Sequence, residues 1–187
     1  NGTTSYDRTN YFETVPRDQL DMVLWIESDR MGYLLDVLDQ GLLDVQRDVV
    51  KNERRQSYDN APYGPSYLAL VEALFPPGHP YNGAVIGSMT DLSAATLDDV
   101  KGFFKDYYTP SNATLAIVGD FETAAVKASI QKYFGGLANR PKKATPETKA
   151  PPARFGRYVV EEPVDLAQVT FGYRTPPAYT TDDPIVD

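Results

Sequence analysis

The sequence contains no cysteine, a single histidine and a single tryptophan. Without cysteine it can form no disulfide, thiolate nucleophile or cysteine-ligated zinc site, and an oxidising compartment is permitted but not shown. His79 cannot make a zinc site by itself, and its position in a proline-rich loop favours a structural hydrogen bond. No run approaches the roughly 20 apolar residues of a membrane helix, and no charged-then-apolar signal segment opens the chain.

The common sequence signatures of catalysis are also missing. The chain has no GxxxxGK[ST], GxGxxG, GxSxG or CxxC, so nucleotide, α/β-hydrolase and thiol chemistry lose their usual markers. A net charge of -8 argues against nucleic acid or an anionic membrane surface as the main partner, because both favour basic patches. Basic or neutral polypeptides remain open as partners.

The composition is that of a globular protein. With 187 residues, 42% of them hydrophobic and 12% aromatic, the chain can bury a core and is most simply one domain, or most of a larger one. Both ends suggest a piece of a longer domain: residue 1 is Asn, and residues 182–187 read as the opening of an unfinished helix. We therefore expect 1–187 to be a single incomplete α+β domain.

Periodicity predicts a largely helical chain with strands on both sides of a helical middle. The pattern predicts helices over 17–33, 42–58, 66–75, 96–107 and 124–134, and strands over 9–15, 114–118, 157–161 and 168–173. Thr96 and Asp99 resemble a capping box that opens a helix with Val100, Phe103 and Tyr107 toward the core. Residues 139–156, rich in proline and lysine, read as an exposed connection. The predicted fold class is α+β, a mixed, mostly antiparallel sheet covered by helices.

Glu53 continues an apolar stripe. Leu42, Val45 and Val49 recur at three- and four-residue intervals, which predicts the buried face of an amphipathic helix, and Glu53 is the next member of that face. A buried unpaired carboxylate is costly, so it needs an arginine, a hydrogen-bond network or a metal ion. Position alone favours an ordinary ion pair or hydrogen bond, and leaves a metal open.

Several segments in the same order resemble the pitrilysin-like M16 zinc peptidases, which include insulin-degrading enzyme and mitochondrial processing peptidases; the bacterial members are the most similar. The resemblance covers nearly the whole chain and is carried by residues 1–16 (NGTTSYDRTNYFETVP), 49–56 (VVKNERRQ), 60–64 (NAPYG), 78–81 (GHPY), 107–113 (YYTPSNA) and 118–120 (VGD).

This resemblance implies a zinc site. The family binds zinc through both histidines of an HxxEH motif, whose Glu is the base for the zinc-bound water, and through a Glu on a later helix, which Glu53 matches. HxxEH is absent here and is expected upstream of residue 1, so this chain alone holds zinc weakly or not at all. Gln46 stands where several members carry an auxiliary Glu, and Arg54 or Arg55 is expected to pair with a carboxylate.

Asn1, Gly2, Thr3 and Thr4 match the strand on which the family binds an extended peptide as an added strand, the alternative being an ordinary sheet edge. The resemblance thus implies part of a zinc endopeptidase built as a clamshell of two homologous halves, with the second half in the same chain or in another subunit. The alternative is a non-catalytic M16-like scaffold or substrate-binding subunit. Bacterial members often carry export signals, which implies a periplasmic or otherwise extracytoplasmic location, with the cytoplasm as the alternative.

Overall fold

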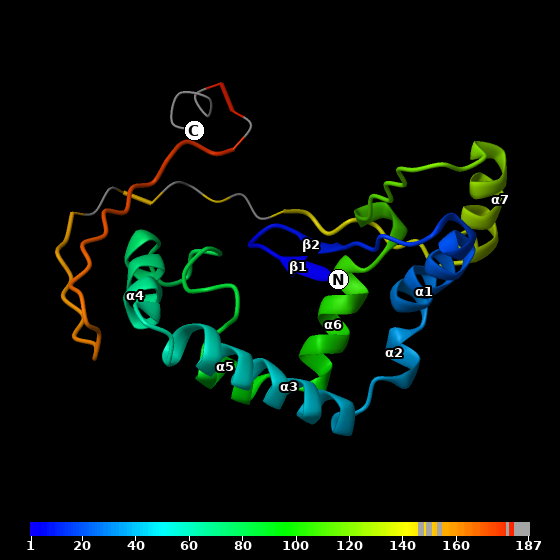
Figure 1. Ribbon diagram of the computed structural model, residues 1–187. Helices are drawn as coiled ribbons and strands as arrows, with labels where there is room; N and C mark the ends of the chain where they lie inside the picture. The colour runs from blue at the N-terminus through cyan, green and yellow to red at the C-terminus, as the bar shows by residue number, and fades with distance from the viewer. Residues whose placement is uncertain (146–147, 149–150, 153–154, 179, 182–187) are drawn as a thin grey trace. The chain divides into compact units, whose positions relative to one another are not determined.

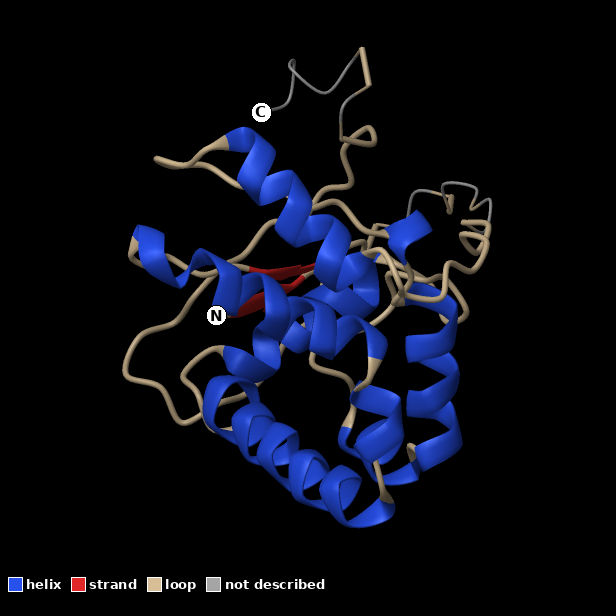
Figure 2. Cartoon of the chain, turned by 90° about the vertical axis from the view of Figure 1, so that its right-hand side faces the viewer, coloured by secondary structure: helices blue, strands red, loops and turns tan. Residues whose placement is uncertain are grey.

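Helices make up most of the regular structure, and the described strands form one short hairpin (Figure 2). A computed structural model describes residues 1–145, 148, 151–152, 155–178 and 180–181. The helix opening predicted over 182–187 lies outside the described residues. A helix-dominated α+β class is therefore confirmed, whereas the described residues contain only a small part of the predicted sheet.

The chain forms two compact units, each described here by itself. The first comprises residues 1–47 and 93–146, and the second comprises 48–92 and 147–187. The elements in chain order are β1 Gly2–Thr4, β2 Thr9–Tyr11, a 3-10 turn Arg17–Gln19, α1 Leu20–Gly32, α2 Leu34–Val37, α3 Gln40–Arg54, a π-helical turn Arg55–Asp59, α4 Gly64–Leu74, α5 Met89–Ala94, α6 Leu97–Tyr107, a 3-10 turn Pro110–Asn112 and α7 Thr123–Phe134.

In the first unit α1 and α7 lie side by side (Figure 1). Leu24 of α1 and Val126 of α7 are buried. The capping box at the start of α6 is confirmed, because Asp99 N–H donates to the Thr96 hydroxyl at 3.2 Å and Thr96 N–H donates to the Asp99 carboxylate at 2.9 Å. The expected inward face of α6 is wrong for Phe103 and Tyr107, which are 50% and 39% exposed, and Val100 is half-buried.

Thr109 joins two segments of the first unit that are distant in sequence. Its side chain is fully buried, and its hydroxyl accepts a hydrogen bond from the Arg140 backbone N–H at 2.8 Å. The Arg140 side chain returns to α6, donating to the carbonyl oxygens of Lys105 and Tyr108. The chain after α7 is thereby fixed to the end of α6.

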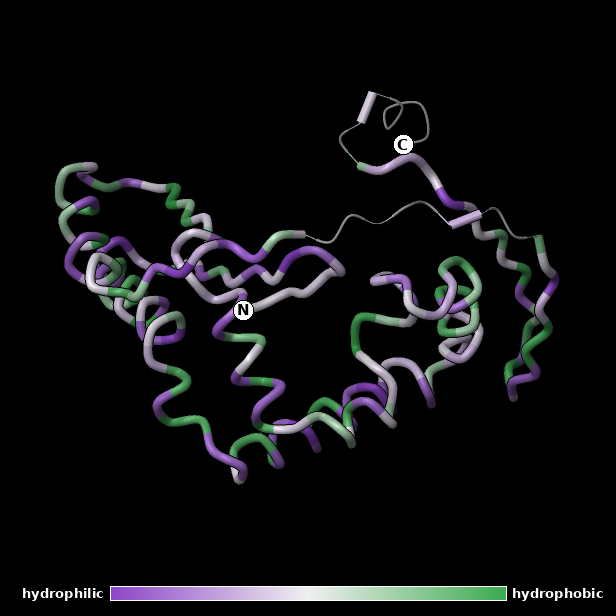
Figure 3. The backbone as a smooth tube through the Cα atoms, turned by 180° about the vertical axis from the view of Figure 1, so that it is seen from behind, coloured by the Kyte–Doolittle hydropathy of each residue, from purple (hydrophilic) through white to green (hydrophobic). Residues whose placement is uncertain are grey.

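The second unit holds α4 and the segment that follows the proline-rich stretch. Val71 of α4 is buried, and Gly172 lies so close to Leu70 that an added Cβ would come within 2.5 Å of the leucine side chain. Short polar and apolar stretches follow one another along 155–174, as the purple and green colours in Figure 3 show. Arg174 donates to the carbonyl oxygens of Pro151 and Pro152 at 2.6 and 2.7 Å. The segment is thus held against α4 without regular secondary structure.

The strands predicted over 114–118, 157–161 and 168–173 are not strands among the described residues. The alternating pattern and β-branched residues of these segments are typical of strands. A strand also requires a neighbouring strand with which to form its ladder of hydrogen bonds. None of the described residues provides that ladder, and side chains such as Val118 and Phe171 remain exposed. The prediction of strand 9–15 is right for Thr9–Tyr11, which pairs with β1.

Candidate functional site

Glu53 lies in the last turn of α3, on the solvent-exposed side of the helix. Asp39 caps the start of α3 by accepting a hydrogen bond from Leu42 N–H at 2.8 Å. The Glu53 side chain is exposed, and no hydrogen bond or ion pair joins it to another described residue. Since no described residue occupies it, the Glu53 carboxylate is available to bind an external ligand.

The predicted burial of the Glu53 face is wrong. Leu42, Val45 and Val49 are exposed, Val45 by 66%. A second stripe at helical spacing is less exposed: Leu43 is buried, and Arg47, Val50 and Arg54 are half-buried. Periodicity could not choose between the two faces, because arginine stems cover apolar surface while their guanidinium groups find partners.

The arginines of that second stripe are both engaged within their own units. Arg47 donates to the Ala95 carbonyl oxygen at 2.6 Å. The Arg54 side chain is only 14% exposed; its Nε lies 3.2 Å from the Asp59 carboxylate and its Nη1 donates to the Gly87 carbonyl oxygen. The expectation that Arg54 or Arg55 pairs with a carboxylate is confirmed for Arg54. Arg54 thus fixes the end of the helix that carries Glu53.

Gln46 lies on α3 seven residues before Glu53, on the same side of the helix. It is exposed, and no hydrogen bond joins its side chain to another described residue. An amide at this position can orient a ligand or a water molecule but cannot supply a charge.

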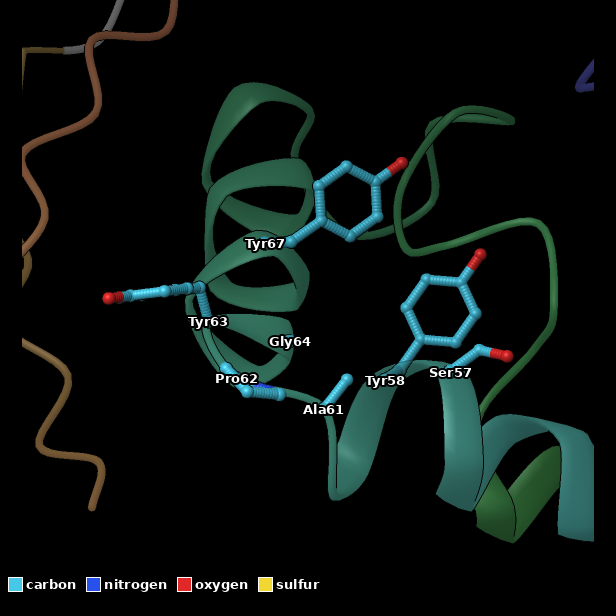
Figure 4. A pocket seen from close by; sticks show the side chains of 7 residues that line it. All are labelled: Ser57, Tyr58, Ala61, Pro62, Tyr63, Gly64 and Tyr67. Carbon is cyan, nitrogen blue, oxygen red and sulfur yellow. The ribbon is translucent and has the colours of Figure 1, made fainter. Parts of the chain in front are cut away.

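A pocket of about 340 Å³ begins one helical turn after Glu53. It is lined by Ser57, Tyr58, Ala61, Pro62, Tyr63, Gly64 and Tyr67. Figure 4 shows the rings of Tyr58 and Tyr67 on one side of it, stacked with centroids 5.9 Å apart, whereas the Tyr63 ring turns away. Ser57 lies in the π-helical turn that follows α3, so the pocket begins shortly after Glu53 along the chain.

The shape of this pocket depends on two backbone features at the start of α4. Tyr63 has φ of 62°, a left-handed conformation that costs energy for a residue other than glycine. Gly64 packs so closely that an added Cβ would lie 1.8 Å from the Tyr58 carbonyl oxygen. In the sequence, residues 60–64 contribute to the family resemblance, and these two backbone roles were not predicted.

Glu162 stabilises the strained turn from a distant part of the second unit. Its carboxylate accepts hydrogen bonds from Tyr63 N–H at 3.0 Å, Ser66 N–H at 3.1 Å and the Ser66 hydroxyl at 2.6 Å. A carboxylate is favoured there, because the first N–H groups of a helix lack intrahelical partners and carry partial positive charge. No local sequence signal pairs residues about a hundred positions apart, so Glu162 was not predicted.

Asn1, Gly2, Thr3 and Thr4 belong to the first unit, where β1 is exposed along its length. Its register is Gly2 to Tyr11, Thr3 to Asn10 and Thr4 to Thr9. Among the described residues β1 pairs only with β2, so its other edge keeps free N–H and carbonyl groups. The strand edge therefore has the main-chain groups needed to add an extended peptide.

The hairpin is fixed to the rest of the first unit by aromatic and charged side chains. The hydroxyl groups of Tyr11 and Tyr108 share a hydrogen bond of 2.6 Å, and the Arg30 guanidinium lies 4.2 Å from the Tyr11 ring centroid. Burial and then the Tyr11 contact raise the pKa of the Tyr108 hydroxyl. Burial and the neighbouring Glu27 raise the pKa of the Glu13 carboxyl just beyond β2.

His79 has the structural hydrogen bond that its loop setting predicted. Its Nδ1 accepts from Tyr81 N–H at 3.0 Å, and its ring stacks on Phe75 with centroids 4.7 Å apart. Among the described residues, no three His, Asp or Glu side chains are grouped closely enough to hold a metal ion. Glu53 could supply one oxygen ligand, and this part of the chain does not complete a zinc centre around it.

Comparison with known proteins identifies similar sequences and structures. The pattern of a family described as "Peptidase M16 inactive domain" matches residues 94–186. "Zinc protease PqqE" of Helicobacter pylori is 36% identical over 180 residues, 94% of this chain and 40% of that protein. An uncharacterized zinc protease of Mycobacterium leprae is 26% identical over 185 residues, 94% of this chain and 39% of that protein. The chain thus spans about two fifths of the length of these curated relatives.

Two solved structures are similar as well. The crystal structure of a protease from Helicobacter pylori has a TM-score of 0.71 and 36% identity, over 80% of this chain and 36% of that one. A mutant of the ferredoxin protease FusC in complex with Arabidopsis ferredoxin has a TM-score of 0.68 and 25% identity, over 80% of this chain and 16% of that one.

Proposed function

Because the chain belongs to the M16 peptidase family, we propose that it is part of a zinc-dependent endopeptidase and supplies one zinc ligand, Glu53. The observation that carries the proposal is the exposed Glu53 carboxylate, which makes no hydrogen bond or ion pair with another described residue. Exposed carboxylates such as Asp48 are common on helices, so the choice of Glu53 also requires its match to the Glu that the family carries on a later helix. The match to a relative named a zinc protease extends over this helix as well.

The residues present fit one ligand position, and the remaining ligands must come from outside the described residues. When bound, zinc polarises the substrate carbonyl and activates a water molecule. Arg54 would hold the end of α3 in place through Asp59 and the Gly87 carbonyl oxygen, so that Glu53 is presented by a rigid helix. Gln46 is proposed to orient a neighbouring ligand or water on the same helix face.

We propose that β1 binds the substrate main chain. Asn1 to Thr4 carry small or short polar side chains, and β1 has one edge without a partner among the described residues. An extended peptide added there would gain main-chain hydrogen bonds whatever its sequence. Within the second unit, we propose separately that the pocket at Ser57 and Tyr67 accepts an apolar or aromatic side chain, because it is lined by aromatic rings.

The wider assembly is proposed from the family. The chain would be an incomplete α+β domain whose unpaired segments 114–118, 157–161 and 168–173 join a mixed sheet in the full-length protein, opposite a second homologous half. Substrates would be peptides or unfolded polypeptides. Among the described residues no helix is both long and apolar enough to cross a membrane. An extracytoplasmic location is proposed from the resemblance to exported bacterial members.

The match of residues 94–186 to a domain described as inactive favours a second candidate function. In that case the chain would belong to a non-catalytic scaffold or substrate-binding subunit. The matched residues do not include Glu53, so both functions are compatible with that finding. They differ in whether the full-length protein hydrolyses peptides.

The test is peptide hydrolysis by the full-length protein, using a quenched fluorescent library of unstructured peptides. We expect activity that o-phenanthroline abolishes and that Glu53→Gln lowers by at least about 100-fold in kcat/KM, since even outer-shell residues of metal sites contribute up to that much. Asp48→Asn, an exposed carboxylate on the same helix, is the matched control and should retain activity. Activity in Glu53→Gln equal to that of Asp48→Asn would refute the role of Glu53, and no hydrolysis by the parent would favour the scaffold.

A further inference from the structure

Helix α1 carries acidic and aromatic residues in alternation along one face. Asp21, Trp25, Asp29 and Tyr33 are each four residues apart, so their side chains line one side of the helix. Trp25 is 53% exposed and Tyr33 is 52% exposed, although large aromatic side chains usually bury most of their surface. Neither Glu53 nor β1 contributes to this face.

This face forms one wall of a hollow of about 370 Å³ within the first unit. The hollow is lined by Trp25, Ser28, Asp29, Tyr33, Lys132 and Tyr133, which come from α1, from the residue that follows α1 and from α7. Ser28 is buried, and its hydroxyl donates to the Trp25 carbonyl oxygen at 2.7 Å. The lining therefore combines three aromatic rings with one carboxylate and one amine.

The amine in the hollow is already neutralised by its neighbours. Lys132 Nζ donates to the Tyr133 hydroxyl at 2.7 Å, lies 4.3 Å from the centroid of the same ring and is 3.8 Å from the Asp21 carboxylate. The hydrogen bond to Tyr133 raises the pKa of the Lys132 amine. Asp21 also accepts from Ser129 and Tyr133, whose hydrogen bonds lower the pKa of its carboxyl.

Asp29 is left without such a counter-charge. No described cation or donor pairs with its carboxylate, and the residue is exposed. Its neighbours one turn away on either side are the rings of Trp25 and Tyr33. An uncompensated carboxylate between exposed aromatic rings matches the requirements of a cationic side chain, which is attracted both by the charge and by the ring faces.

We propose that the hollow formed by Trp25, Asp29, Tyr33 and Tyr133 binds a basic side chain of a polypeptide partner, with arginine preferred to lysine. Arginine is preferred because its planar guanidinium stacks on aromatic faces and can donate two hydrogen bonds to one carboxylate. The net charge of -8 would attract a basic segment to the chain as a whole. Arg30, which lies over Tyr11, shows the same pairing within this unit.

Trp25 is the single tryptophan of this chain, so the part of a fluorescence change in the full-length protein that Trp25→Phe removes reports on the hollow. We would titrate the protein with acetyl-Gly-Gly-Arg-Gly-Gly-amide into the millimolar range and follow fluorescence, with isothermal titration calorimetry as an independent measure. The matched peptides carry Lys, Gln or Glu in place of Arg. We expect saturable binding in the order Arg, then Lys, and no saturation with Gln or Glu.

Two variants that change the charge of the hollow in opposite directions test the role of Asp29. At a separation of roughly 6 Å in a water-like medium, one charge changes affinity about threefold. Asp29→Asn should weaken binding of the arginine peptide by about threefold, and Lys132→Gln should strengthen it by a similar factor. Asp36→Asn, which removes another exposed carboxylate of the same unit, is the control and should have little effect. Near-ultraviolet circular dichroism checks that the variants are folded.

The proposal is overturned by equal responses to the Arg and Gln peptides, by equal affinities of Asp29→Asn and Asp36→Asn, or by preference for the Glu peptide. The last result would mean that Lys132 and not Asp29 determines the ligand. Absence of binding by both fluorescence and calorimetry would also overturn it.

Discussion

Replacing Glu162 by alanine should loosen the start of α4 and with it the tyrosine pocket. The substitution removes the acceptor of the Tyr63 N–H, the Ser66 N–H and the Ser66 hydroxyl. Loss of a helix-capping acceptor costs about 0.5–2 kcal/mol, and hydrogen bonds to a charged group contribute about 1.5–3 kcal/mol each. Because the site is half-buried and water can replace part of the loss, we expect about 2 kcal/mol.

Hydrogen exchange of the Ser66 amide measures this loss locally. A change of about 2 kcal/mol corresponds to roughly 30-fold faster exchange through local opening. Glu162→Gln keeps one acceptor oxygen and should lie between the parent and Glu162→Ala. Glu161→Ala, an exposed neighbour, is the control and should leave Ser66 exchange unchanged. Equal exchange in Glu162→Ala and Glu161→Ala would refute the capping role.

Substitutions of Gly64, Thr109 and Glu13 test further contacts within each unit. Gly64→Ala should strongly destabilise the second unit, because its Cβ would overlap the Tyr58 carbonyl oxygen; a urea midpoint equal to that of the parent would contradict this. Thr109→Val should cost about 1–3 kcal/mol in urea unfolding, because it leaves the part-buried Arg140 N–H facing a fully buried side chain without its acceptor; a change within error would contradict this. Glu13→Gln should raise the melting temperature at pH 7 and lose that gain near pH 4. The pKa of Glu13 is raised in the folded state, so its ionised form disfavours folding as pH rises through that pKa, and a gain independent of pH would contradict this.

Local signals located the helices well, because helix formation depends on neighbours within four residues. The capping box at Thr96 is an example, and α7 begins and ends within one residue of the predicted 124–134. The strands were less well predicted, since 114–118 has the right composition but its pairing depends on partners elsewhere. Glu162 could not be found for the same reason.

The face of α3 illustrates a different limit. Two stripes at helical spacing compete on this helix, one with Leu42, Val45 and Val49 and one with two arginines. A hydrophobicity pattern favours the first, whereas in the described structure the second is the less exposed, because Arg47 and Arg54 reach carbonyl oxygens and carboxylates. Glu53 was therefore selected by a periodicity argument that was wrong about burial. Its proposed role as a ligand now depends on its exposure and on the family.

The most direct test of that role is the zinc content of the full-length protein, measured by mass spectrometry of the purified metal-loaded chain beside Glu53→Gln and Asp48→Asn. The account predicts about one zinc per chain in the parent and in Asp48→Asn, and a severalfold weaker retention against a chelator in Glu53→Gln. Zinc retained equally by Glu53→Gln, or absent from all three proteins, would contradict it.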